Sequence, residues 1–256
     1  MTTKSSPFIW HDLITTDVEA AKTFYAQVIG WNMQSFPGNE DYTVVSAGTV
    51  GVGGIMAIPP DACDRGAPAC WQGHIAVDDV DGCADRILSH GGAIIHPAAD
   101  IPNVGRFALA ADPQGAIFII FKPQGSEPMP RAAPLTPGLV GWNELHAVDG
   151  LKAFDWYSKI FGWTQSRDMD MGPMGIYRLF ATGGEPVGGM MTKMPDMPKP
   201  FWAYYFNVES IDAAVERTTK AGGQVINGPH EVPGPMFTVN CQDPQGAWFS
   251  MVAPKR

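Results

Sequence analysis

The stretch that decides the fold occurs twice. Asp17-Val-Glu-Ala-Ala-Lys-Thr-Phe-Tyr25 is followed by Ile29-Gly-Trp31, and the pattern returns as Asp149-Gly-Leu-Lys-Ala-Phe-Asp-Trp-Tyr157, followed by Phe161-Gly-Trp163. An aspartate at the start can cap a helix, and the apolar residues behind it recur at helical spacing. Glycine suits the position that ends such a helix. Each copy therefore predicts an amphipathic helix with one buried face.

Three more motifs repeat in the same order. They are Val52-Gly-Gly-Ile-Met56 with Val187-Gly-Gly-Met-Met191, Gly91-Gly92 with Gly222-Gly223, and Asp112-Pro-Gln-Gly-Ala116 with Asp243-Pro-Gln-Gly-Ala247. The offset between copies stays between 131 and 135 residues, which indicates a duplicated unit. We predict one module over residues 1–124 and a second over 138–256. Proline is dense over residues 125–137, which predicts a semi-rigid linker between them.

Each module has the same expected order of elements. An apolar run, Phe8–Ile14 or Leu139–His146, predicts a strand before the helix. In the first module we expect strands near 31–36, 42–47 and 51–58, then a strand at Trp71–Val77, a helix at Asp79–His90, and strands at Arg106–Ala111 and Ala116–Phe121. This pattern predicts an α+β fold of paired βαβββ units, whose curved mixed sheets enclose a cleft suited to a small molecule.

The bulk properties narrow the choice of partners. A net charge of −9 argues against a nucleic acid or an anionic membrane surface as the main partner. No apolar run is long enough to cross a bilayer, and the first residues show no signal-peptide pattern. The four cysteines form no CxxC pair. We therefore expect a cytoplasmic protein with reduced thiols, either a monomer or a homodimer.

The order of elements and the repeated motifs, together with His74-Ile-Ala-Val-Asp-Asp-Val-Asp81, resemble the vicinal oxygen chelate superfamily. This superfamily contains glyoxalases, bleomycin resistance proteins and extradiol dioxygenases, and the resemblance covers nearly the whole chain. The first strand of each module also resembles that of a two-module subgroup, in Trp10-His-Asp-Leu13 and Trp142-Asn-Glu-Leu145. Its members carry labels such as hydroxylase or secreted mycobacterial antigen.

The resemblance implies a divalent metal held at three positions in each module. The first-strand position is Trp10 or Trp142, the position before the second helix is His74 or Tyr205, and the last-strand position is Ile119 or Ser250. Of these residues, His74 alone fits a ligand role. A catalytic metal site needs about three protein ligands. We therefore expect no resident cofactor, and leave open a divalent metal held by other side chains.

Residues two apart on a strand share its face, so the side chains that flank the family positions should enter the cleft. Asp12 and Glu144 are equivalent and are the catalytic candidates, as a ligand anchor or a general base. The alternative is a structural carboxylate satisfied by nearby donors. The candidates for ligand binding are Trp10, His74, Trp142, His146, Tyr205, Asn207, Trp248 and Ser250.

Several of these candidates have more than one interpretation. His74 is either a ligand-contacting group or a satisfied strand histidine. Glu144 and His146 together indicate either a metal site at another place than the family's ligand positions or an acid–base pair. Trp10 and Trp142 either stack on a planar ligand or fill the cleft.

We predict a small-molecule binding protein of the glyoxalase and bleomycin-resistance type, which takes a hydrophobic or aromatic ligand without a full metal site. The alternative is an enzyme: a glyoxalase-like lyase, isomerase or dioxygenase that uses a metal or a carboxylate base. A third interpretation is a structural protein with collapsed clefts. Module two has more polar groups and is the favoured location of the site.

Overall fold

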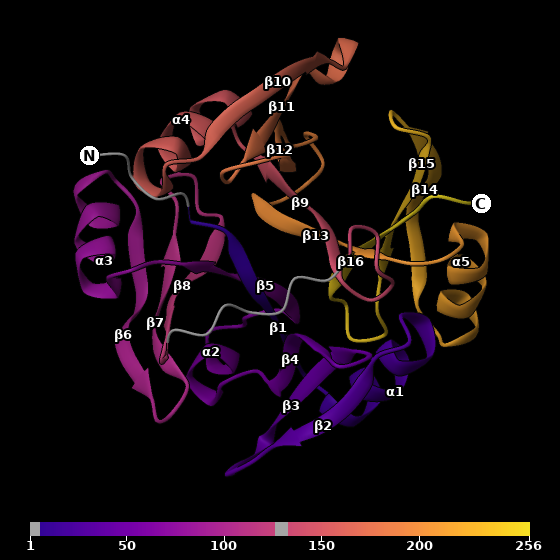
Figure 1. Cartoon of the computed structure of the whole chain (residues 1–256), viewed down its shortest axis with the longest axis horizontal. Helices are drawn as coiled ribbons and strands as arrows, with labels where there is room; N and C mark the ends of the chain where they lie inside the picture. Colours follow the sequence, from indigo (N-terminus) through magenta and orange to yellow (C-terminus); the bar gives the residue numbers. More distant parts are fainter. Residues whose placement is uncertain (1–5, 126–132) are drawn as a thin grey trace. The chain divides into compact units, whose positions relative to one another are not determined.

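The computed structural model describes residues 6–125 and 133–256, and the same order of strands and long helices occurs twice in them (Figure 1). The first copy contains β1 (Phe8–Thr15), α1 (Val18–Val28), β2 (Asn32–Phe36), β3 (Asn39–Ala47), β4 (Val50–Ala57), α2 (Pro60–Asp64), β5 (Cys70–Ala76), α3 (Val80–Ser89), β6 (Ala93–Ile101), β7 (Gly105–Ala111) and β8 (Ile117–Pro123). The second contains β9 (Val140–Ala147), α4 (Gly150–Phe161), β10 (Thr164–Asp170), the short helix η1 (Gly172–Met174), β11 (Ile176–Ala181), β12 (Pro186–Thr192), β13 (Phe201–Asn207), α5 (Ile211–Lys220), β14 (Gln224–Val232), β15 (Met236–Gln242) and β16 (Trp248–Ala253).

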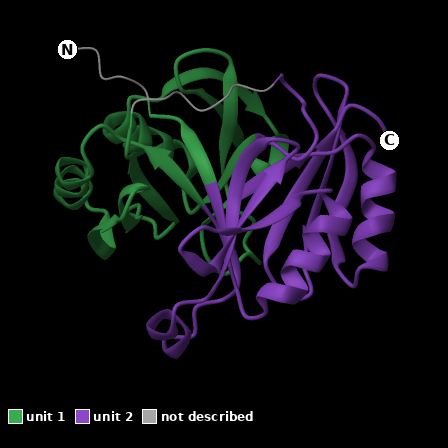
Figure 2. Cartoon of the chain, turned by 60° about the horizontal axis from the view of Figure 1, so that its bottom comes forward, with its two compact units in different colours: residues 1–10, 73–128, 142–202 green, residues 11–72, 129–141, 203–256 purple. Residues whose placement is uncertain are grey.

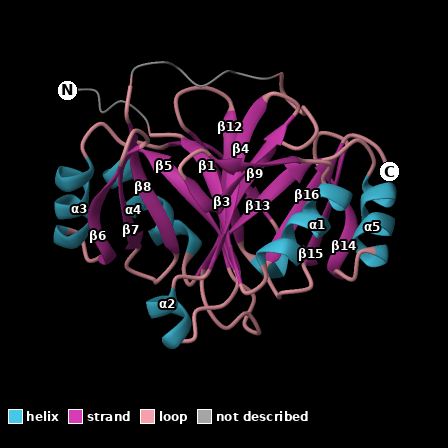
Figure 3. Ribbon diagram, turned by 90° about the horizontal axis from the view of Figure 1, so that it is seen from below, coloured by secondary structure: helices cyan, strands magenta, loops and turns pink. Residues whose placement is uncertain are grey.

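The strands form two eight-stranded mixed sheets with one topology. Their orders are β2-β3-β4-β1-β5-β8-β7-β6 and β10-β11-β12-β9-β13-β16-β15-β14. β1 pairs with β4 in parallel and β9 pairs with β12 in parallel, whereas the hairpins of each sheet are antiparallel. Within unit 1, α3 lies against β6 and β7, and within unit 2, α5 lies against β14 and β15 (Figure 3). This confirms the predicted α+β class and the paired βαβββ units.

Some local expectations need adjustment. β6 and its counterpart β14 were not placed by the sequence pattern, and the loop after β4 contains the short helix α2. The module boundaries at 124 and 138 stay a prediction. Of the expected linker, residues 126–132 lie outside the described part of the chain. No helix of the described residues is long and apolar enough to cross a membrane.

The chain packs into two compact units, and each unit combines halves of both modules (Figure 2). Unit 1 comprises residues 1–10, 73–128 and 142–202, which is mainly the second half of module one with the first half of module two. Unit 2 comprises residues 11–72, 129–141 and 203–256, the opposite combination. The hydrophobic cores are therefore built from residues of both copies.

The core of unit 2 is an aromatic cluster around Tyr25 of α1. Its ring stacks on Trp31, with ring centroids 5.6 Å apart, and Trp31 meets Phe206 of β13 edge to face at 4.8 Å. Trp71 Nε1 donates to the Tyr25 hydroxyl at 2.9 Å, and that hydroxyl donates to Asp243 Oδ2 at 3.1 Å. Asp243 belongs to the Asp-Pro-Gln-Gly turn of module two, so the helix motif of one copy binds the turn of the other.

Unit 1 contains the same cluster with the modules exchanged. Tyr157 of α4 stacks on Trp163 at 5.2 Å and receives a hydrogen bond from Trp202 Nε1 at 3.0 Å. Phe118 of β8 packs on Tyr157 at 5.6 Å. Burial raises the pKa of Asp112, and the hydrogen bond from Tyr157 opposes that effect. The repeated helix and turn motifs therefore hold the halves of different modules together.

The repeated Gly-Gly pair accommodates an aromatic ring from the other module. A Cβ on Gly223 would lie 2.8 Å from the ring of Phe24, and a Cβ on Gly92 would lie 3.1 Å from the ring of Trp156. Both glycines would need their neighbours to move if they carried a side chain. The absence of a side chain lets the ring pack directly on the backbone.

Candidate functional site

The most polar cluster among the predicted site residues lies on β9, in unit 1. Trp142, Glu144 and His146 alternate along this strand and share a face, as the period of a strand requires. The residues between them point to the other side: Asn143 Nδ2 donates to the Val187 carbonyl at 2.9 Å, and Leu145 is completely buried. Strand alternation alone therefore groups these three side chains.

A chain of hydrogen bonds connects this face to β11. Trp142 Nε1 donates to the Tyr177 hydroxyl at 2.7 Å, and that hydroxyl donates to Glu144 Oε2, also at 2.7 Å. The other carboxylate oxygen, Oε1, lies 3.0 Å from His146 Nε2. A hydrogen bond to an ionised carboxylate is about twice as strong as one between neutral groups. Glu144 is thus held on one side by a phenol and faces an imidazole on the other.

His146 is nearly inaccessible to solvent. Its side chain is 6% exposed and that of Glu144 is 12% exposed. The imidazole ring stacks on Phe201 of β13, with centroids 4.9 Å apart and planes 19° apart. Both ring nitrogens are buried without a hydrogen-bond partner among the described residues, although Nε2 lies 3.0 Å from Glu144 Oε1. Of the two nitrogens, Nε2 thus has a carboxylate oxygen close by, whereas Nδ1 has no such neighbour that accepts or donates a hydrogen bond among the described residues.

The Val-Gly-Gly motif of β12 provides the space for this arrangement. A Cβ on Gly189 would lie 2.2 Å from the Tyr177 ring, and a Cβ on Gly188 would lie 2.2 Å from the Asn143 carbonyl oxygen. A side chain at position 189 would force the tyrosine ring away from the place in which it reaches Glu144. The motif is thus required by close packing beside the candidate site.

Module one has a simpler version of the cluster, in unit 2. The Tyr42 hydroxyl donates to Asp12 Oδ1 at 2.6 Å, and a Cβ on Gly54 would lie 2.1 Å from the Tyr42 ring. The position equivalent to His146, two residues after the carboxylate on the same face of the strand, is occupied by Ile14 and not by a histidine. The two modules thus share the tyrosine–carboxylate pair, and the second adds an imidazole.

The other predicted residues are divided between the units. Trp10, His74 and Ile119 lie in unit 1, where His74 and Ile119 are neighbours across β5 and β8 and His74 meets Phe121 edge to face at 5.6 Å.

Unit 2 contains Asp12, Tyr205, Asn207, Trp248 and Ser250. Tyr205 is paired with Ser250, whose Oγ donates to Asn240 Oδ1 at 2.9 Å. Asn207 Nδ2 donates to the Thr136 carbonyl at 3.3 Å. The hydrogen bonds of Asn207 and Ser250 thus fit a structural role within their strands.

The residues do not fit the metal that the fold family implies. In module one, neither Trp10 nor Ile119 offers a suitable donor to accompany His74. Within the described ranges, no group of three His, Cys, Asp or Glu side chains is arranged to hold a metal ion. Glu144 and His146 supply two donors at most. No metal-dependent step is therefore derived for this site.

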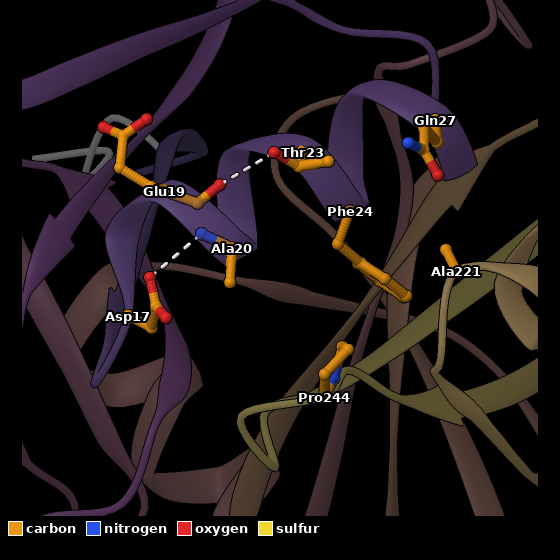
Figure 4. A pocket seen from close by; sticks show the side chains of 8 residues that line it. All are labelled: Asp17, Glu19, Ala20, Thr23, Phe24, Gln27, Ala221 and Pro244. Atoms are coloured by element: carbon orange, nitrogen blue, oxygen red, sulfur yellow. Dashed lines mark hydrogen bonds between the residues drawn. The ribbon is translucent and has the colours of Figure 1, made fainter.

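A separate groove lies beside α1 in unit 2 and has a volume of about 510 Å³ (Figure 4). It is lined by Asp17, Glu19, Ala20, Thr23, Phe24, Gln27, Ala221 and Pro244, none of which is a predicted site residue. Two of its polar groups already have local partners: Asp17 Oδ1 accepts from the Ala20 amide at 3.0 Å, and Thr23 Oγ1 donates to the Glu19 carbonyl at 3.0 Å.

The equivalent place in unit 1 carries a larger aromatic side chain. Trp156 stands in the position of Phe24, and its Nε1 donates to the His90 carbonyl at 2.9 Å. Gln114 also makes two hydrogen bonds to the backbone at the start of α4: its Oε1 accepts from the Asp149 amide at 2.7 Å, and its Nε2 donates to the Asp149 carbonyl at 3.0 Å. The counterpart of Gln114 is Gln245, whose buried Oε1 has no partner among the described residues. We attribute the groove to the smaller aromatic side chain at Phe24.

Sequence reasoning missed Tyr42, Tyr177 and Phe201. The two tyrosines could have been found, because they are 135 residues apart, the same offset as the two Val-Gly-Gly motifs. An aromatic residue that repeats at the offset of a glycine motif is a candidate to pack on it. Phe201 is different, because its contact with His146 joins two strands and leaves no pattern in the sequence.

The fold and these motifs define a class of protein: the chain belongs to the glyoxalase, bleomycin resistance protein and dioxygenase superfamily. The family model described as "Glyoxalase/Bleomycin resistance protein/Dioxygenase superfamily" matches residues 144–251. A second model, "Bleomycin resistance protein-like N-terminal", matches residues 8–48. Both modules therefore contain family sequence.

Within this superfamily, the chain is a two-module member similar over nearly its full length to CFP32 of Mycobacterium tuberculosis, which is provisionally described as a glyoxylase. The two are 35% identical over 96% of this chain and 94% of CFP32. The chain is also 33% identical to the anthracycline biosynthesis protein DnrV of Streptomyces peucetius, over 95% of this chain and 91% of DnrV.

Solved structures share the fold at low sequence identity. The Mn(II)-bound glyoxalase from Novosphingobium aromaticivorans superposes with a TM-score of 0.68 at 13% identity, covering 100% of this chain and 83% of the other. The 2,3-dioxygenase LapB from Pseudomonas sp. KL28 gives 0.66 at 13% identity, with coverage of 100% and 94%. At this identity the likeness concerns the fold alone.

Proposed function

We propose that this protein binds a small organic molecule with a hydrophobic or aromatic body at the β9 face of module two, without a full metal site. The observation that carries the proposal is the arrangement of Glu144. Tyr177 donates to one carboxylate oxygen and the other faces His146, while Trp142 donates to Tyr177 and Phe201 stacks on His146. A few placed polar groups among aromatic side chains are typical of sites for organic ligands.

The relatives support this class of ligand. One of them is named for anthracycline biosynthesis and another is described as a glyoxylase, so both names refer to small organic compounds. The departure from the family's ligand positions favours recognition by hydrogen bonds and aromatic stacking over coordination by a metal. Simple binding requires affinity alone, and the β9 face has the groups for it.

Binding can be tested by calorimetric titration with three planar probes: 2-naphthol, 2-naphthoate and anthraquinone-2-sulfonate. We expect one-to-one saturable binding of at least one probe, reduced about tenfold or more by Trp142→Ala or Tyr177→Ala. Tyr42→Ala in module one is the matched control and should leave the affinity unchanged. If none of the probes binds, or if the two tyrosine variants behave alike, the proposed site is wrong.

The second candidate function is proton abstraction by Glu144, as expected of a lyase or isomerase with a carboxylate base. It is favoured by the short contact with Tyr177 and by the small exposure of the carboxylate. The test is turnover of the hemithioacetal of methylglyoxal and glutathione. Activity that Glu144→Gln abolishes and Asp12→Asn preserves would support catalysis. Equal activity in both variants would reject Glu144 as the base.

A further inference from the structure

We propose that His146 is the polar anchor for the ligand: its Nδ1 accepts a hydrogen bond from a hydroxyl or N–H group, and Glu144 sets the ring tautomer that makes this acceptor available. This inference rests on the proposed function, since it names the chemical group that the same site recognises. It makes His146 a specificity-determining residue and Glu144 a positioning residue.

The direction of the hydrogen-bond chain leads to this assignment. An indole N–H is a donor only, so Trp142 must donate to the Tyr177 oxygen. The tyrosine then gives its own proton to Glu144 Oε2. An ionised carboxylate is an acceptor only, so the remaining oxygen, Oε1, favours a proton on the facing His146 Nε2. In the neutral ring, a proton on Nε2 leaves Nδ1 as a bare acceptor.

Burial gives this acceptor its importance. Nδ1 is buried and has no hydrogen-bond partner among the described residues, and a buried polar atom without a partner costs free energy. Stacking on Phe201 restricts the plane of the ring, so it cannot turn freely to find another partner. A ligand that donates a hydrogen bond to Nδ1 removes the cost. A ligand without a donor leaves it in place.

The expected ligand class is therefore an aromatic or apolar molecule that carries a hydroxyl or N–H donor. The test compares 2-naphthol with 2-methylnaphthalene, which has almost the same shape and no donor. For the wild-type protein we expect the naphthol to bind about tenfold more tightly or better. In His146→Phe, which keeps a ring to stack on Phe201, this preference should disappear.

Glu144→Gln provides a sharper test than loss of binding. The Tyr177 hydroxyl still needs an acceptor, so it should retain the amide oxygen and turn the amide NH₂ toward His146 Nε2. The proton of the ring then moves to Nδ1, which becomes a donor. We expect the preference to change from 2-naphthol to 2-methoxynaphthalene, an acceptor of similar size. If Glu144 had only a structural role, Glu144→Gln would lower the affinity for both ligands by the same factor. Asp12→Asn is the control and should keep the wild-type order.

The tautomer can also be measured without a ligand, from the ¹⁵N chemical shifts of His146. We expect protonated Nε2 and bare Nδ1 in the wild type, and the reverse in Glu144→Gln. A wild-type ring protonated at Nδ1, or an equal preference in wild type and His146→Phe, overturns the inference while leaving binding intact. If the expected tautomer is found but no naphthalene binds, it is the proposed function that fails, and the anchor role fails with it.

Discussion

The hydroxyl of Tyr25 donates to Asp243 at 3.1 Å, although the two residues are 218 positions apart and belong to different modules. Burial raises the pKa of Asp243 above its usual value, and the hydrogen bond from Tyr25 opposes this. The folded protein consequently holds the proton of this carboxyl more tightly than the unfolded chain does. The protonated carboxyl of Asp243 therefore favours the folded state at low pH, and this contribution to stability is lost as the pH rises through the pKa of the folded protein.

We therefore predict that Asp243→Asn changes the pH dependence of stability. The stability of the variant relative to wild type should increase as the pH rises from about 4, near the ordinary aspartate pKa, to neutrality. Urea unfolding at several pH values measures this. Asp196→Asn, at an exposed position, is the control and should follow the wild type. If the free energy of unfolding depended on pH in the same way in wild type and Asp243→Asn, burial would not be raising the pKa of this carboxyl.

Gly189→Ala should disturb the candidate site. Its Cβ would overlap the Tyr177 ring, so the tyrosine must move away from Glu144. We expect a loss of stability of about 1–3 kcal/mol from overpacking, together with weaker probe binding. Gly54→Ala displaces Tyr42 in the same way and should cost similar stability while leaving probe affinity unchanged. If Gly189→Ala left the probe affinity unchanged, the position of Tyr177 would not matter for ligand binding.

Phe24→Trp should fill the groove beside α1. Trp156 occupies the equivalent position in unit 1, where its indole donates to a backbone carbonyl. We predict a gain in stability of about 0.5–2 kcal/mol for Phe24→Trp, measured by chemical denaturation. The reciprocal variant, Trp156→Phe, should lose about 1–3 kcal/mol through the lost packing and the carbonyl left without its donor. Destabilisation by Phe24→Trp would mean that the groove is not a packing defect.

Neither module should fold alone as a monomer. Residues 1–124 contain Tyr25, Trp31 and Trp71 but lack Phe206, Phe249 and Asp243, which complete the cluster in unit 2. We expect the isolated module to be aggregated, molten or dimeric by gel filtration and near-ultraviolet circular dichroism. Co-expression with residues 138–256 should restore the native spectrum. A cooperatively folded monomer of residues 1–124 would contradict this.

Much of the fold could be predicted because the duplication shows every motif twice. The helices that begin after Asp17 and Asp149 form where their caps and apolar spacing indicate, and both aspartates accept the expected capping bonds. The sequence could not reveal that the copies exchange halves. Tyr25 has the same pattern whether it packs on its own module or on the other, and the pairing depends on contacts far apart in the chain.

The candidate site was only partly predictable. Strand alternation placed Trp142, Glu144 and His146 on one face, and hydrogen bonds and a short contact through Tyr177 and Glu144 connect them in the structure. It could not supply Tyr177, which reaches Glu144 across the sheet, or the unpaired state of His146 Nδ1. These features depend on which strands are neighbours and on side-chain orientation. The sequence therefore identifies residues that can do chemistry, whereas their partners follow from sheet topology.

The exchange of halves has a consequence for the history of the duplicated gene. Each copy holds half of both cores, so neither copy can be deleted or allowed to decay without exposing the aromatic surfaces of the other. The Tyr–Trp–Asp contacts of the two copies are therefore needed together for both cores to be complete. The residues around Asp12 and Glu144 take no part in these aromatic clusters, and they differ between the copies, with isoleucine at position 14 and histidine at position 146. The scaffold contacts are thus common to both copies, whereas an imidazole two residues after the carboxylate occurs in the second copy alone.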